Sequence, residues 1–181
     1  RPDVNAVLHS HSPFATAFGA ARKDVPHPFL PEAVVSIGPE VPRVSIAPPG
    51  SDAVVAFNQC INRGQVFIVE GNGVFSVGKN MEQAYLRMEL LEHVCRVAHV
   101  AHSIGGVQLL DEALAQALTA KHIKAGLAAP HYASARPAQR ALELTEKVKD
   151  KLGGRGAVFS TERFEETVRA VVAETLSELG R

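Results

Sequence analysis

The sequence predicts an α/β fold in which a single β-sheet is flanked by helices. Short β-branched or aromatic runs, typical of strands, alternate along residues 1–127 with longer amphipathic segments typical of helices. Two of the strand-like runs are separated by Gly71-Asn72-Gly73. This tripeptide is typical of a hairpin turn, because Gly and Asn tolerate a positive φ. Together these features favour one sheet with helices packed on it.

The order of elements follows from local patterns. A buried strand is predicted over Val4–Leu8, and Ser12-Pro13 should begin a helix that ends near Arg22, with Ser12 as its N-cap. Val25–Pro31 is a proline-punctuated loop. The remaining predicted elements are strands over Ala33–Gly38 and Arg43–Ile46, a helix over Ala53–Asn62, strands over Gln65–Glu70 and Val74–Gly78, a long helix from Asn80 to about Ser103, and a helix over Leu109–Ala125.

The chain divides into three predicted regions. Residues 1–127 form the α/β domain, 128–160 form a linker with a short helix, and 161–181 form a C-terminal amphipathic helix. This helix, with Val168, Val171 and Leu176 on its apolar side, resembles the short peptides that target enzymes into bacterial microcompartments. That resemblance implies contact with a shell protein. The alternative is an ordinary terminal helix that packs on its own domain or on a neighbouring subunit.

Charge and composition exclude several classes of protein. Lys+Arg and Asp+Glu number 19 each and are scattered, so neither a nucleic-acid nor a membrane partner is expected. No apolar run is long enough for a transmembrane span, and no signal pattern is present. Cys60 and Cys95 lie in apolar patterns, which favours two core thiols over a disulfide and indicates a cytoplasmic protein. The chain begins at Arg1 and enters a strand almost at once, so we expect a further segment upstream.

The strongest chemical feature is His9-Ser10-His11 at the end of the first predicted strand. Residues i and i+2 project from the same face of a strand, so both imidazoles can reach one ion. Neutral imidazole is a good ligand for Zn²⁺. The alternative for an isolated HxH is a pair of surface or packing histidines.

Several motifs in order carry a family resemblance. They are RPDVNAVLHSHSPFATA at 1–17, PFLPEA at 28–33, PPGS at 48–51 and GNGVFSVGKNMEQAY at 71–85. Over about residues 1–103 this combination closely resembles the class II aldolase/adducin family, apparently without the family's N-terminal segment. The resemblance implies an α/β/α sandwich and a divalent metal.

The resemblance also assigns the metal ligands. His9 and His11 match the first two, while the third histidine of the family corresponds here to Asn72. An amide oxygen can ligate a hard cation but is a poor replacement for imidazole on zinc. Glu70 lies two residues before Asn72 and could share the site. The family's catalytic Glu and phosphate-binding loop would precede Arg1, so no catalytic residue is assigned.

The function implied by the resemblance is a divalent-metal-dependent aldolase, a carbon–carbon lyase acting on a small sugar phosphate such as L-fuculose 1-phosphate. The metal, Zn²⁺ or another divalent ion, would polarise the substrate oxygens. A homo-oligomer, specifically a tetramer, is implied as well. Two alternatives stay open: a 4-epimerase, dehydratase or decarboxylase of the same family, or a non-catalytic adducin-like assembly module.

The other histidines receive simpler interpretations. His27, in the proline loop, should be solvated. His99 and His102 are one turn apart near a helix end, where they suit the helix dipole or could form a second metal site. His122 and His131 have no recognisable partner, and His93 should be a packing or surface residue.

Overall fold

The computed structural model describes residues 1–131 together with 151, 163, 166, 167 and 169–171. The chain divides into two compact units, Arg1–Ala133 and Ser134–Arg181. Most of the predicted linker and of the predicted C-terminal helix lies outside the described residues, so both stay predictions. All of the elements below belong to the first unit.

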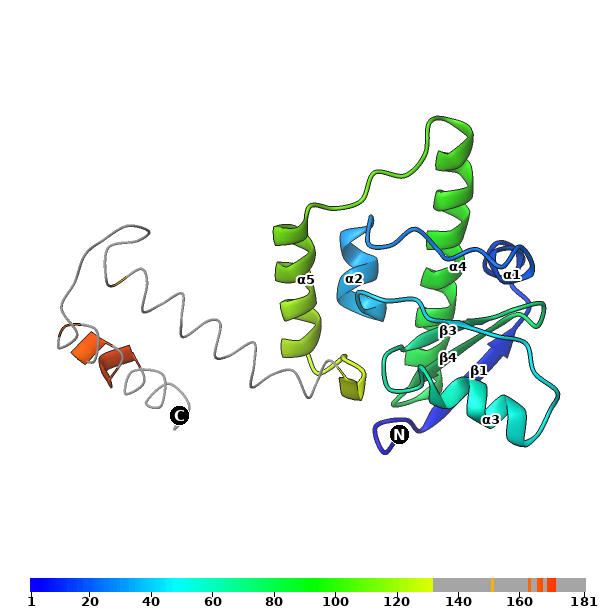
Figure 1. Cartoon of the computed structure of the whole chain (residues 1–181), viewed down its shortest axis with the longest axis horizontal. Helices are drawn as coiled ribbons and strands as arrows, with labels where there is room; N and C mark the ends of the chain where they lie inside the picture. The colour runs from blue at the N-terminus through cyan, green and yellow to red at the C-terminus, as the bar shows by residue number, and fades with distance from the viewer. Residues whose placement is uncertain (132–150, 152–162, 164–165, 168, 172–181) are drawn as a thin grey trace. The chain divides into compact units, whose positions relative to one another are not determined.

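The first unit is a mixed α/β structure built around one four-stranded sheet (Figure 1). The strands are β1 (Ala6–Ser10), β2 (Arg43–Val44), β3 (Val66–Val69) and β4 (Val74–Gly78). The helices are α1 (Pro13–Ala20), α2 (Pro31–Ile37), α3 (Ser51–Asn58), α4 (Met81–Ser103) and α5 (Glu112–Lys124). The sheet order is β1-β4-β3-β2, with β4 antiparallel to both neighbours and β2 parallel to β3. The predicted fold class and hairpin are confirmed.

Alternate residues of β3 pack on opposite faces of the sheet. Val66 and Ile68 join a core cluster with Leu91 and Val94 of α4. Phe67 and Val69 join a second cluster, in which Phe57 packs edge-on against Phe67 at 5.9 Å between ring centroids. The sheet is therefore covered by α4 on one face and by α3 on the other, as the period of two in a strand requires.

The turn between β4 and α4 is fixed by two reciprocal hydrogen bonds that resemble a capping box. The Asn80 side chain accepts a hydrogen bond from the Gln83 N–H at 2.9 Å. In return, the Gln83 side chain accepts one from the Lys79 N–H, also at 2.9 Å. This pattern confirms the predicted start of the long helix and holds its first turn against the end of the hairpin.

The strand predicted over Ala33–Gly38 is wrong, because these residues form most of α2. The β-branched run favoured a strand, but Ala33, Val34 and Ile37 are buried together at helical spacing. Pro31 begins the helix and Gly38, at φ 95°, ends it. Tertiary packing here outweighs the local β preference.

Other boundaries shift by a few residues. β2 contains two residues rather than four, α3 begins at Ser51 and ends at Asn58, and α5 begins at Glu112 after the Asp111 cap. Cys60 and Cys95 are both buried free thiols, as expected. Burial and the nearby Glu92 carboxylate raise the pKa of Cys95 to about 12.

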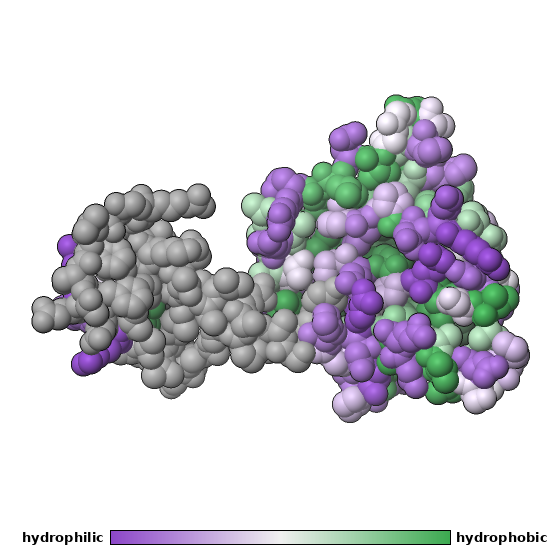
Figure 2. Space-filling view, viewed as in Figure 1, coloured by the Kyte–Doolittle hydropathy of each residue, from purple (hydrophilic) through white to green (hydrophobic). Residues whose placement is uncertain are grey.

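Within the described part of the chain, no helix combines the length and apolar character that a membrane crossing needs. Figure 2 shows hydrophobic and hydrophilic residues interspersed over the visible face of the first unit.

Candidate metal site at the end of strand β1

His9 lies in β1, His11 directly follows the last residue of this strand, and both are exposed. Their rings meet edge to face, with centroids 5.1 Å apart and planes at 79°. Leu8, between Val7 and His9, instead packs toward the α4 core. The strand alternation predicted from the sequence thus brings the two imidazoles together on the α3 side of the sheet.

Two contacts from β4 orient the His9 ring. Its Nδ1 atom lies 2.9 Å from the Val74 carbonyl oxygen. A carbonyl can only accept, so Nδ1 carries the proton and the neutral ring keeps the lone pair on Nε2. The Phe75 ring, directly across the ladder, stacks on His9 at 4.2 Å. A backbone acceptor on one ring nitrogen is the usual arrangement for an imidazole whose other nitrogen binds a metal.

The hairpin turn approaches His11 closely through Gly73. A Cβ atom added to this residue would overlap the Ser10 carbonyl oxygen and would lie 2.6 Å from Cδ2 of His11. Gly73 also has a φ of 76°. Only glycine meets both conditions, so the turn can lie directly against the histidine pair.

Asn72 is exposed in that turn, immediately before Gly73. Its backbone N–H donates to the Val69 carbonyl oxygen at 3.1 Å, which closes the turn. The turn therefore lies beside His11, while the role of the Asn72 side chain as a ligand stays a prediction. No group of three or more His, Cys, Asp or Glu side chains in the described residues is arranged to hold a metal ion.

Glu70 has a structural role instead. Its side chain is largely buried and forms ion pairs with Arg43 and, at 3.6 Å, with Arg22. Each carboxylate oxygen faces one guanidinium group. The expectation that Glu70 might share the metal site is therefore wrong, because its charge is already paired.

The helix that follows the histidines is anchored by a residue far along the chain. The two carboxylate oxygens of Glu92, on α4, accept hydrogen bonds from the backbone N–H groups of Phe14 and Ala15 at 3.0 and 2.9 Å. Ser12 occupies the N-cap position as predicted but makes no side-chain capping bond within the described residues. Glu92 replaces that cap and fixes α1 directly after the histidine pair.

Two other histidines have backbone partners, and of these His27 is half-buried and His122 is fully buried. Nε2 of His27 lies 2.8 Å from the Gly38 carbonyl oxygen, and Nδ1 of His122 lies 2.8 Å from that of Val35. Burial lowers the pKa of both imidazoles, and the charge of Arg87 lowers that of His122 further. The expectations of a solvated His27 and of a partnerless His122 are wrong. Both rings hold the C-terminal turn of α2.

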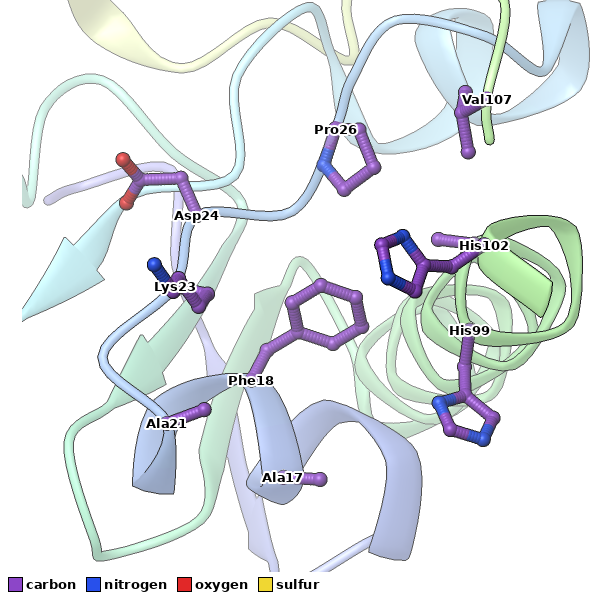
Figure 3. A pocket seen from close by; sticks show the side chains of 10 residues that line it. Ala17, Phe18, Ala21, Lys23, Asp24, Pro26, His99, His102 and Val107 are labelled. Atoms are coloured by element: carbon purple, nitrogen blue, oxygen red, sulfur yellow. The ribbon is translucent and has the colours of Figure 1, made fainter. Parts of the chain in front are cut away.

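The second histidine pair borders a different cavity. A pocket of about 640 Å³ lies between α1, the loop at 23–26 and the end of α4. Figure 3 shows the His102 ring directed toward Phe18, while His99 lies nearer Ala17. The His99 ring also packs on Phe14 at 5.5 Å. In the described residues no third ligand of the usual kind joins this pair, so a second metal site is not supported.

Sequence reasoning found the histidine pair but missed the groups that orient it. Val74 and Phe75 contact His9 only because of the register that pairs His9 with Phe75. Gly73 is the residue from which the close turn could have been predicted, since a glycine beside Asn72 already indicated a turn with a positive φ.

Comparison with known proteins identifies the family of this chain. The sequence profile of the class II aldolase and adducin N-terminal domain matches residues 1–99 of 181. The chain belongs to this family.

Individual proteins are similar to this chain over about half of its sequence or more. L-fuculose phosphate aldolase of Methanococcus maripaludis strain C7 is 29% identical over 102 residues, covering 56% of this chain and 54% of the relative. The 3-oxo-tetronate 4-phosphate decarboxylase of Pectobacterium atrosepticum is 30% identical over 105 residues, covering 55% and 47%. A solved structure of L-fuculose 1-phosphate aldolase superposes with a TM-score of 0.61 at 17% identity, covering 67% of this chain and 57% of that one. The chain spans about half the length of these curated relatives.

Proposed function

We propose that this protein is a divalent-metal-dependent carbon–carbon lyase that acts on a small sugar phosphate such as L-fuculose 1-phosphate. The observation that carries the proposal is the geometry of His9, whose Nδ1–H is held by the Val74 carbonyl so that Nε2 is free beside the His11 ring. Two surface histidines without a ligand would need no such orientation. The names of the relatives supply the class of reaction and of substrate.

The three proposed donors suit a divalent cation, and their mixture of nitrogen and oxygen atoms affects which cation they prefer. His9 and His11 would supply two imidazole nitrogens, and Asn72 in the adjacent turn would supply an amide oxygen. Oxygen donors favour harder ions, so we expect weaker zinc binding here than at a site with three imidazoles. A bound divalent metal would act as a Lewis acid on the substrate's oxygens. Phe75 and the Val74 carbonyl would hold His9 in its ligating orientation.

Proton transfer is not assigned to any described residue. Glu70 is paired with two arginines and Glu92 caps α1, so neither carboxylate is free to exchange a proton with a substrate beside the histidines. We expect the general acid/base to come from a segment beyond this chain or from another subunit of a homo-oligomer.

A second candidate function, that of a non-catalytic assembly module, is favoured by the identity of residue 72. The family resemblance assigns the third ligand position to Asn72 rather than to a histidine, and the described residues contain no group of three conventional ligands. A domain of this family that had lost metal binding would serve as a non-catalytic assembly module, as adducin heads do. Decarboxylation is the main alternative among enzymes, because one relative is named as a decarboxylase.

A substrate panel separates these functions. The full chain would be incubated with Mn²⁺, Co²⁺ or Zn²⁺ and with L-fuculose 1-phosphate, 5-deoxy-D-ribulose 1-phosphate or 3-oxo-tetronate 4-phosphate, with and without any upstream segment that its gene encodes. The proposal predicts metal-dependent cleavage of a ketose phosphate, L-fuculose 1-phosphate or 5-deoxy-D-ribulose 1-phosphate, into dihydroxyacetone phosphate and an aldehyde. A His9→Ala/His11→Ala variant should lack this cleavage. Release of carbon dioxide together with dihydroxyacetone phosphate from 3-oxo-tetronate 4-phosphate, with neither ketose phosphate cleaved, would indicate the decarboxylase. A folded, metal-free protein that converts no substrate would favour the assembly module.

A further inference from the structure

A cavity of about 420 Å³ lies at the N-terminal end of α4 and shares no lining residue with the histidine site. Its walls come from α2, from the turn between β4 and α4, from the first turns of α4 and from Leu127. The charged side chains in this lining are Lys79, Glu82 and Arg87.

Arg87 is unusual because its charge is buried without a counter-ion among the described residues. Only 5% of the residue is exposed. Its hydrogen bonds reach neutral acceptors: Nη1 donates to the Gln65 side chain at 3.1 Å and to the Val77 carbonyl at 2.6 Å, and Nη2 donates to the Leu127 carbonyl at 3.1 Å. Two of its five N–H groups therefore have no acceptor in the part of the chain that the structure describes. A buried guanidinium of this kind favours an anion.

The other charges leave the cavity net positive. Lys79 is exposed and makes no ion pair within the described part of the chain, while Glu82 carries the single opposing charge of the lining. The acidic group that acts on Arg87 is Asp3, which is itself held by Arg1 through two short contacts of 2.9 and 2.7 Å. Asp3 therefore does not neutralise the guanidinium.

We propose that this cavity binds a phosphate-type oxyanion, either inorganic phosphate or the phosphate group of a small metabolite. The planar guanidinium offers its remaining donors to two oxygens of such an anion, and the flexible Lys79 ammonium can close over a third. The positive end of the 23-residue α4 helix favours the same charge. The site is independent of metal binding at His9 and His11.

Titration calorimetry with the full chain in a phosphate-free buffer tests the proposal. Inorganic phosphate would be added at constant ionic strength, with chloride as the reference salt and glycerol 1-phosphate as a second arm. We expect saturable binding of phosphate and none of chloride. Tighter binding of glycerol 1-phosphate would identify a metabolite as the ligand, and equal or weaker binding would identify the free anion.

Three variants locate the anion. Lys79→Gln should weaken phosphate binding by about fivefold and Glu82→Gln should tighten it by about threefold, since each changes one charge beside the anion. Lys124→Gln, at an exposed lysine on α5, is the matched control and should change nothing. Arg87→Gln should abolish binding. Because that variant also removes structural hydrogen bonds, circular dichroism must show that it folds. If it does not fold, the phosphate affinities of the Lys79 and Glu82 variants test the proposal.

The histidine variant keeps the two proposals apart. His9→Ala/His11→Ala should bind phosphate as the natural chain does. Loss of phosphate binding in this variant would place the anion at the histidine site and overturn the proposal. So would an absence of saturable binding, or equal affinities in the Lys79, Glu82 and Lys124 variants.

Discussion

At the residue scale, the close approach of Gly73 to the Ser10 carbonyl oxygen and the His11 ring is the tightest constraint on the candidate site. Gly73→Ala would place a methyl group 2.6 Å from the His11 ring at a φ of 76°. We expect a loss of about 2–4 kcal/mol in the free energy of unfolding, from backbone strain and steric overlap together. Urea denaturation measures it.

Gly126→Ala separates the two causes. Gly126 has a similar φ of 71°, but no atom of the described residues lies within 4 Å of the place that an added methyl group would occupy. This control should lose only about 1 kcal/mol, the cost of the backbone conformation. Equal losses in the two variants would mean that the turn does not lie tightly against Ser10 and His11.

If Asn72 is the third ligand, as proposed, its amide oxygen should determine which metal the site prefers. Asn72→His would replace an amide oxygen by a third imidazole, so zinc affinity should rise by at least about tenfold while manganese affinity changes little. Competition with a chromogenic chelator measures both. The exposed Asn58→His variant, on α3, controls for a histidine placed elsewhere on the surface. Unchanged zinc affinity in Asn72→His would show that position 72 does not face the ion.

How far the sequence predicts this site depends on the kind of contact. The pairing of His9 with His11 follows from the period of a strand, which is a local property. The Val74 and Phe75 contacts depend on the register between β1 and β4, whose strands lie about 65 residues apart in the chain. No local pattern specifies that register.

At the element scale, Glu92 links α4 to the beginning of α1. Glu92→Gln removes the negative charge that accepts from the Phe14 and Ala15 N–H groups. We expect a loss of about 1 kcal/mol in unfolding free energy, since a charged acceptor at a helix N-terminus is replaced by a neutral one. Glu89→Gln, at an exposed position of α4, should leave stability within about 0.5 kcal/mol of the natural chain. Similar denaturation midpoints for both variants would contradict this role for Glu92.

Helix α2 shows where local reasoning about elements fails. Val34, Val35 and Ile37 have high β propensity, yet the segment is helical because its buried residues match a helix face and because Pro31 and Gly38 bound it. His27 and His122 add hydrogen bonds to its last carbonyls. These partners lie outside the segment, so its own sequence could not reveal them.

At the scale of the whole molecule, the same two histidines should make stability depend on pH. Burial lowers both pKa values below the ordinary value of 6.5. In acid, the unfolded chain then binds more protons than the folded chain. The contribution of the two neutral imidazoles to the free energy of unfolding is therefore complete above about pH 6.5 and is lost as the pH falls through the folded pKa values. Urea midpoints at pH 7.5 and 5.5 measure the effect.

His27→Gln and His122→Gln should each reduce the difference between those two midpoints. His93→Gln, at an exposed position on α4, should leave it unchanged. The account of the α2 end would be contradicted if all three variants kept the full pH dependence of the natural chain.

The fold class of the first unit could be predicted from the sequence because strand and helix periods alternate clearly along it. The function of the whole protein could be predicted only by resemblance, since the chain spans about half the length of its curated relatives.

The central claim is that His9 and His11 bind a divalent metal, and elemental analysis tests it most directly. The full chain and its His9→Ala/His11→Ala variant would be purified side by side after growth with zinc, manganese and cobalt, and their bound metal would be measured by mass spectrometry. The account predicts about one divalent ion per natural chain and none in the variant. A metal-free natural chain, or equal metal in both proteins, would contradict it.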